Sequence, residues 1–132
     1  MSKIKDQFPN SFIYYEPKDI VSGDFYWYEF LKNNPMLAVV DCTGHGVPGA
    51  LLSVMGIPSL NEIVSRSASL NAAQILEDLK TYVVRSLHQT GSSDEARDGI
   101  EIALCIIDPE KRSIECSGAN RPLYQVRKKG EK

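Results

Sequence analysis

The sequence has no long hydrophobic run, few cysteines and no excess of basic residues, and each shortage excludes a class of protein. Its longest apolar runs, at 36–40 and 102–107, fall far short of the roughly 18 residues that span a membrane. The three cysteines, Cys42, Cys105 and Cys116, match no zinc spacing, which favours reduced cytosolic thiols. The net charge of −2 argues against nucleic-acid binding. No apolar stretch follows the first charged residues, as it would in a secretory signal. We therefore expect a cytoplasmic protein whose present segment contacts neither a membrane nor nucleic acid.

The rest of the composition is typical of a folded domain. The 132 residues correspond to about one domain length. Hydrophobic residues make up 42% of the chain, which is sufficient for a buried core. We expect residues 1–132 to belong to a single domain.

Strand and helix patterns follow one another in an order typical of α+β folds. The predicted strands cover residues 11–18, 24–31, 36–40, 100–108, 112–118 and 122–128. A first helix begins near Pro48, and a second helix covers 71–88 with Asn71 as its cap. Pro58 lies inside the first helix, where it removes a backbone donor, so we expect a kink or a break between Gly56 and Pro58. Strands on both sides of a helix pair favour an α+β fold over a parallel sheet.

The segment VVDCTGHGVPGA at 39–50 is the strongest local feature. Asp41 stands at the C-terminal end of a predicted buried strand, before a glycine-rich turn into a helix. An acid in that place is exposed at the edge of the sheet, where a ligand can approach it. The same side chain can instead cap the turn or the helix. The pattern leaves both interpretations of Asp41 open.

Asp24 is a second acid in a similar setting. If strands 24–31 and 36–40 pair antiparallel, the start of the first lies beside the end of the second, and Asp24 lies near Asp41. Two crowded carboxylates repel each other unless a cation lies between them, and Mg²⁺ and Mn²⁺ prefer oxygen ligands. The pair therefore predicts a divalent metal site.

Other residues near these acids carry weaker predictions. His45, between two glycines, can act as a general acid, donate a hydrogen bond to phosphate, or simply occupy the loop. A nucleophilic role for the Cys42 thiol has little support, because the only base close in sequence is His45. Asp98 and Glu101 are candidate additional site acids, although a loop end and a solvent-facing strand position are the simpler interpretations.

Four segments in order resemble successive motifs of the bacterial PPM (PP2C-like) serine/threonine phosphatases of the SpoIIE/RsbU type. They are VSGDFYW, VVDCTGHGVPGALLSVMG, DGIEIALCIID and CSGANRPLY. The resemblance extends over roughly residues 9–126. It implies an αββα sandwich of antiparallel sheets flanked by helices, with a two-metal Mn²⁺ or Mg²⁺ centre at one end.

The resemblance also implies roles for individual residues. Asp41 is similar in position to the family's metal-bridging aspartate, and the backbone carbonyl of Cys42 to its carbonyl ligand. Asp24 corresponds to the acid of the SGD motif at the metal cluster. Gly44, His45 and Gly46 correspond to the phosphate-site loop that wraps around the metal centre in the family. Hydrolysis of phosphoserine or phosphothreonine would then resemble direct attack by a metal-bridged hydroxide, without a phosphoenzyme.

The sequence departs from the family pattern near its end. Family members carry further acidic ligands after the SGANRPLY region, whereas Glu131 is the only acid after Glu115. We therefore expect the N-terminal portion of a domain, with an incomplete metal centre, an incomplete fold and weak or absent activity. The predicted apolar strand at 123–126 would be an unpaired edge, which predicts a homodimer through the incomplete sheet.

We consider three hypotheses for the function of this chain. The first is a metal-dependent protein phosphatase, whose substrate, by resemblance, is a phosphorylated regulatory protein such as an anti-sigma factor antagonist; such domains commonly sit behind sensor or receiver modules. The second is an aspartyl-phosphate enzyme, which requires a parallel sheet and an acid or Lys in place of Cys42, and neither is found. The third is a non-catalytic interaction module, a pseudo-phosphatase, which has no need of Asp24 and Asp41 in exposed loops.

Overall fold

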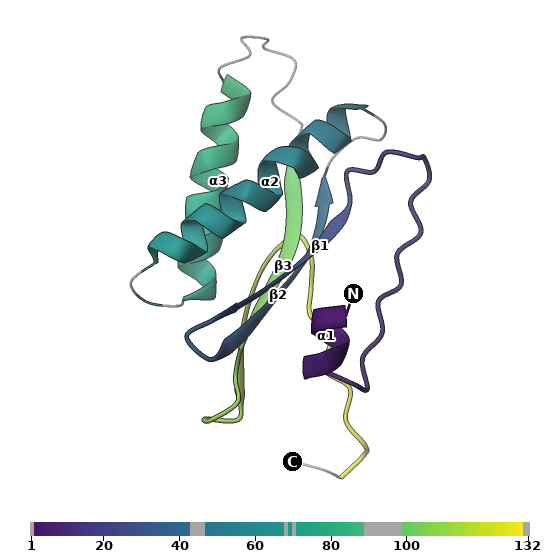
Figure 1. Cartoon of the computed structure of the whole chain (residues 1–132), viewed down its shortest axis with the longest axis vertical. Helices are drawn as coiled ribbons and strands as arrows, with labels where there is room; N and C mark the ends of the chain where they lie inside the picture. The colour runs from purple at the N-terminus through teal and green to yellow at the C-terminus, as the bar shows by residue number, and fades with distance from the viewer. Residues whose placement is uncertain (1, 43–46, 68, 70, 89–98, 131–132) are drawn as a thin grey trace.

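A four-stranded antiparallel sheet with two long helices on one face organises the chain (Figure 1). This computed structural model describes residues 2–42, 47–67, 69, 71–88 and 99–130. In chain order the elements are α1 Ser2–Gln7, β1 Phe25–Leu31, β2 Asn34–Cys42, α2 Val47–Arg66, α3 Ala72–His88, β3 Ile100–Asp108 and β4 Ser113–Ala119. The strands pair in the order β1-β2-β3-β4. The predicted α+β class and antiparallel pairing are confirmed.

The core lies between one face of the sheet and the helices α2 and α3. Successive strand side chains point to opposite faces, and the alternate residues of β2 that face the helices are fully buried. The buried strand residues include Phe25, Trp27, Met36, Ala38, Val40, Cys42, Ile102, Leu104 and Ile106. On the helices the core residues recur at helical spacing and include Leu52, Leu60, Val64, Ile75, Leu79 and Val83. A hydrogen bond of 2.8 Å from Trp27 Nε1 to Asn61 Oδ1 also joins β1 to α2.

The β1–β2 hairpin fixes which strand ends meet. Its two turn residues, Lys32 and Asn33, have φ values of 52° and 64°, as a two-residue turn matched to the twist of the strands requires. The resulting register pairs Phe25 with Val40. The start of β1 therefore lies beside the end of β2, as the sequence predicted.

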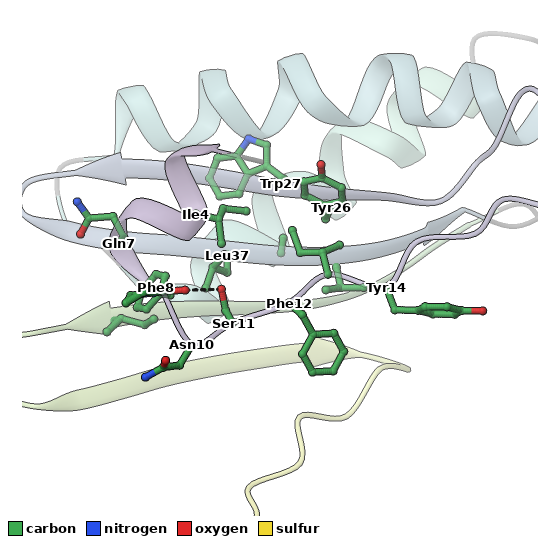
Figure 2. A pocket seen from close by; sticks show the side chains of 15 residues that line it. Ile4, Gln7, Phe8, Asn10, Ser11, Phe12, Tyr14, Tyr26, Trp27 and Leu37 are labelled. Carbon is green, nitrogen blue, oxygen red and sulfur yellow. Dashed lines mark hydrogen bonds between the residues drawn. The ribbon is translucent and has the colours of Figure 1, made fainter.

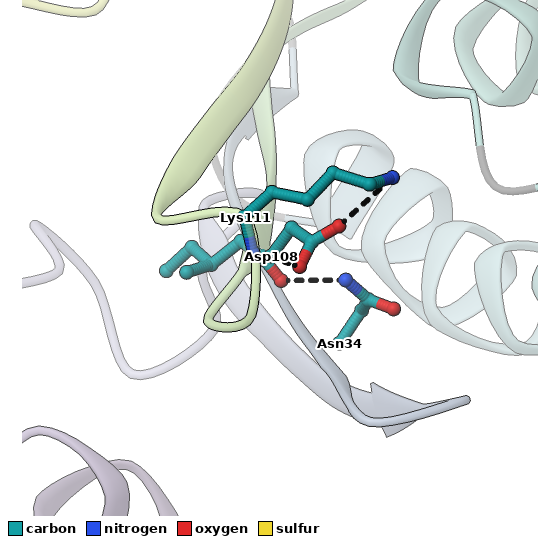
Figure 3. A network of polar contacts seen from close by, with 4 residues as sticks. Asn34, Asp108 and Lys111 are labelled. Atoms are coloured by element: carbon teal, nitrogen blue, oxygen red, sulfur yellow. Dashed lines mark hydrogen bonds and ion pairs between the residues drawn. The ribbon is translucent and has the colours of Figure 1, made fainter.

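The β3–β4 turn is held by a local polar network (Figure 3). Asp108 accepts a hydrogen bond of 2.9 Å from the backbone N–H of Lys111, and Lys111 Nζ lies 3.2 Å from its other carboxylate oxygen. The backbone hydrogen bond, followed by the ammonium group, lowers the pKa of Asp108. Asn34 donates a hydrogen bond of 2.9 Å to the Ile107 carbonyl, which ties the start of β2 to the end of β3.

The first turn of α3 has two caps. Asn71 Oδ1 accepts a hydrogen bond of 2.9 Å from the backbone N–H of Gln74, which confirms the predicted cap. Glu115 of β4 accepts a second, of 2.6 Å, from the backbone N–H of Ala72. The second cap joins residues far apart in the sequence, so a local pattern gave no sign of it.

Of the kink or break expected between Gly56 and Pro58, the break is wrong, because α2 continues through Pro58 as one helix. Both halves of the helix contribute side chains to the same core, Leu52 before Pro58 and Leu60 after it. The burial of these side chains offsets the backbone hydrogen bond that proline cannot donate. Gly56 lies against the Phe25 ring, where an added Cβ would be 3.0 Å from the ring.

Two further predicted strands are not formed. Residues 11–17 have no regular structure. Together with α1 they border a cavity of about 690 Å³ on the side of the sheet away from α2 and α3, where Figure 2 shows Ile4 facing Leu37. Residues 121–128 also lie outside any strand, and Tyr124 and Val126 are 81% and 92% exposed. Hydrogen bonding to a neighbouring strand stabilises an extended segment, and neither segment has one among the described residues. The strand on which the predicted homodimer depended is therefore not formed.

The order of elements also differs from the predicted one, because α1 precedes the sheet and four of the six predicted strands form among the described residues. Those strands make one sheet with α2 and α3 on one face, and its edge strands are β1 and β4. Within the same residues, no helix is both long enough and apolar enough to cross a membrane.

Candidate metal and phosphate site

Asp24 and Asp41 line one cavity of about 250 Å³ at the end of the sheet where β1 begins and β2 ends. The pairing of Phe25 with Val40 leaves Asp24, which directly precedes β1, beside Asp41 near the end of β2. Asp24 is exposed, and the Asp41 side chain is 40% exposed. The structure therefore brings the two predicted acids together where a ligand from solvent can reach both.

The loop before β1 holds Asp24 in place through its backbone. The Asp24 N–H donates a hydrogen bond of 3.0 Å to Ser22 Oγ, and the Tyr15 hydroxyl donates one of 2.9 Å to the Asp24 carbonyl. Gly23 packs so closely that an added Cβ would lie 3.0 Å from Gly49 Cα and 3.1 Å from the Cys42 carbonyl oxygen. Glycine at this position thus allows the Asp24 loop to approach the end of β2.

Cys42 presents its backbone, and not its thiol, to this region. Its side chain is 2% exposed and belongs to the core. Burial, with a smaller contribution from the charge of Asp24, raises the pKa of the Cys42 thiol to about 12. A thiol in this state is a poor nucleophile at neutral pH, in agreement with the little support that the sequence gave to thiol chemistry.

Arg121 is a site residue to which the sequence analysis assigned no role. Its Nη2 forms an ion pair with Asp41 Oδ2, and its Nε lies 3.0 Å from Glu101 Oε2. Asp41 and Glu101 are direct partners across β2 and β3, so one guanidinium can contact both carboxylates. Glu101, which the sequence left between a site acid and a solvent-facing residue, therefore belongs to this charged group.

The turn after β4 delivers Arg121 to the acids. Asn120 has a φ of 55° and bridges to Ile102 of β3. A Cβ on Gly118 would overlap the Arg121 carbonyl oxygen. The Gly, Asn and Pro of SGANRP are residues that favour turns. They are the sequence signal from which the return of the chain toward the sheet at Arg121 could have been predicted.

The composition of the site suits a hard cation. The carboxylates of Glu16, Asp24 and Asp41 line the cavity with the guanidinium of Arg121, which also contacts Glu101, so the group carries a net negative charge. The side-chain atoms that could bind a metal here are carboxylate oxygens, which Mg²⁺ and Mn²⁺ prefer as ligands. Within the described ranges, no three acidic, cysteine or histidine side chains are grouped closely enough to hold a metal ion by themselves. Gly44, His45, Gly46 and Asp98 lie outside the described residues.

Comparisons with known proteins agree with this fold. Residues 32–132 match the family described as Stage II sporulation protein E (SpoIIE). Among solved structures, the SiaA-PP2C domain of Pseudomonas aeruginosa superposes with a TM-score of 0.73 and 27% sequence identity, over 89% of this chain and 46% of that one. The chain thus spans less than half of that neighbour. A search of curated proteins found no match.

These matches confirm the resemblance to PP2C-like domains that the four motifs indicated. PP2C-type phosphatases generally depend on Mn²⁺ or Mg²⁺, in keeping with an oxygen-rich site. Because the family match covers most of its residues, the chain belongs to the Stage II sporulation protein E (SpoIIE) family.

Proposed function

We propose that these residues belong to a metal-dependent protein serine/threonine phosphatase. One observation carries the proposal: Asp24 and Asp41 line a single cavity in a chain of the SpoIIE family. We assign the activity to the domain of which residues 1–132 form the N-terminal portion, because the chain corresponds to 46% of its PP2C-type neighbour. The substrate is phosphoserine or phosphothreonine on a regulatory protein of the cytoplasm, such as an anti-sigma factor antagonist.

The ligands for Mn²⁺ or Mg²⁺ are the carboxylates of Asp24 and Asp41 and the backbone carbonyl of Cys42. The approach of the Gly23 backbone to the Cys42 carbonyl oxygen supports this set, because it brings the loop of one acid to the end of the strand that carries the other. A bound divalent ion supplies Lewis-acid activation of water and of the phosphoryl group. Such a mechanism needs carboxylates and no side-chain nucleophile, which suits a site where the only nearby thiol is buried.

Arg121 provides the positive group in the wall of the cavity. A guanidinium presents a planar set of donors that fits carboxylate and phosphate oxygens equally well. In this structure those donors contact Asp41 and Glu101. The same donors are suited to orient the phosphoryl oxygens of a substrate.

A calorimetric Mn²⁺ titration of the chain tests the proposal, with Asp41→Asn and Asp24→Asn as variants and Asp78→Asn as control. Asp78 accepts a hydrogen bond from Gln74 on the surface of α3, so its substitution removes the same charge away from the cavity. We expect the wild type and the control to bind Mn²⁺ and both site variants to bind it more weakly.

Equal binding by all four proteins would contradict the assigned ligands. No binding by the wild type, together with no Mn²⁺-dependent hydrolysis of a phosphoserine peptide by the complete domain, would favour the alternative of a non-catalytic interaction module. The peptide assay therefore separates a wrong ligand set from a wrong function.

A further inference from the structure

Cys105 and Cys116 form a second cluster of reactive side chains, separate from the carboxylates. The two residues are direct partners across β3 and β4, and their Sγ atoms lie 2.8 Å apart. Their register partners place them on the sheet face opposite α2 and α3, since the neighbouring pair of Leu104 and Ser117 faces the helices. The proposed phosphatase function uses neither thiol.

The strand geometry suits a covalent bond between them. Directly opposed residues in an antiparallel pair have Cα atoms about 4.5–5.5 Å apart, which falls within the range of about 4.4–6.8 Å found for disulfides. A bond between Cys105 and Cys116 would therefore join two strands that are already paired. It would close only the short β3–β4 hairpin.

The surroundings of the pair distinguish the two thiols. Cys116 is exposed, whereas Cys105 is only partly accessible. Burial, followed by the hydrogen bond and the charge of the neighbouring thiol, raises the pKa of Cys105 to about 12. A depression of about 290 Å³ adjoins both sulfur atoms, and Arg121 and Leu123 contribute to its wall. A small molecule can approach the exposed thiol there.

We propose that Cys105 and Cys116 are a redox modification site, which forms an intramolecular disulfide in exchange with a low-molecular-weight disulfide such as oxidised glutathione. The Cys116 thiolate attacks one sulfur of oxidised glutathione, and one glutathione thiolate leaves. The Cys105 thiol then loses its proton and attacks Sγ of Cys116 in this mixed disulfide, a step that its raised pKa slows and the contact between the two sulfur atoms favours, and the second glutathione leaves. Two protein thiols are oxidised, one disulfide is reduced to two glutathione thiols, and the two protons pass to the leaving thiolates.

Cys42 provides an internal control. Its thiol is buried in the core on the helix-covered face of β2, on the opposite side of the sheet from the pair. It should therefore remain a free thiol while the other two react. The variant Cys42→Ser removes it from the count of thiols without altering the proposed site.

The test is incubation of the reduced chain with oxidised glutathione, followed by intact-protein mass spectrometry, peptide mapping and titration of free thiols. We expect free thiols to fall from three to one in the wild type and from two to none in Cys42→Ser. The mass should decrease by two hydrogen atoms, the peptides that contain Cys105 and Cys116 should be linked, and dithiothreitol should restore both thiols. The variant Cys105→Ser should stop at a glutathione adduct on Cys116.

Several results would overturn the proposal. They are a stable glutathione adduct on Cys116 in the wild type, a disulfide that involves Cys42, a disulfide between two chains, and no reaction at all. Maleimide labelling of Cys116 in the untreated protein would show that the absence of a reaction does not result from an inaccessible thiol.

Discussion

Replacement of Arg121 by Gln should tighten the binding of Mn²⁺ at the proposed site. The guanidinium contacts the carboxylates of both Asp41 and Glu101, so a cation that binds Asp41 competes with it. The three side chains are 43%, 40% and 39% exposed, and ion pairs at this exposure contribute about 0.2–1 kcal/mol each. Because only the pair with Asp41 competes with the metal, its removal should lower the Kd for Mn²⁺ by about 1.4- to 5-fold.

Isothermal titration calorimetry of the wild type and Arg121→Gln measures this change. Arg127→Gln is the matched control, because Arg127 is exposed and, within the described part of the chain, its side chain bonds to Gln125 alone, at 3.2 Å. The difference between wild type and variant should shrink at high salt, which screens charges at the surface. A wild type that binds Mn²⁺ as tightly as Arg121→Gln, or more tightly, would refute the competition between this guanidinium and the metal.

Three further predictions concern the stability of the fold. Gly23→Ala should lower the free energy of unfolding by about 1–3 kcal/mol, because its Cβ would lie 3.0 Å from Gly49 Cα; an unchanged urea midpoint would contradict this close contact. Asn71→Ala should remove the cap of α3 and destabilise the protein by about 1 kcal/mol, which thermal unfolding measures as a lower Tm. Asp108 has a lowered pKa because of its hydrogen bond from Lys111, so it stabilises the fold above the ordinary carboxyl pKa and this contribution disappears as pH falls through its folded-state pKa. Asp108→Asn should therefore show a smaller loss of Tm between about pH 5 and pH 2 than the wild type, and equal losses would show that this carboxylate does not contribute.

The local elements of the fold could be predicted because their causes lie within a few residues. Asn71 caps α3 because it stands three residues before the N–H that it accepts from. The β1–β2 hairpin follows from Lys32 and Asn33, whose positive φ values set the turn and hence the register. Antiparallel pairing of strands 24–31 and 36–40, on which the sequence prediction depended, was sufficient to expect Asp24 near Asp41.

The errors have a shared origin in contacts between distant residues. Pro58 disfavours a helix locally, yet α2 continues because Leu52 and Leu60 pack into one core. The aromatic residues at 11–17 resemble a strand, but a strand needs a hydrogen-bonded neighbour, and this segment instead borders a cavity on the sheet surface. Local propensity cannot account for either outcome, because each depends on what packs against the segment.

The sequence by itself determined the α+β class, the two hairpins, the cap of α3 and the pair of acids, since each depends on short-range periodicity, on turn residues or on a motif. Only the tertiary structure decided that Arg121 contacts Asp41 and Glu101, that Glu115 caps a helix from another part of the chain, and that Cys105 and Cys116 touch. These contacts join residues on different elements. Their positions are set by strand register and by the packing of the core, which no local pattern specifies.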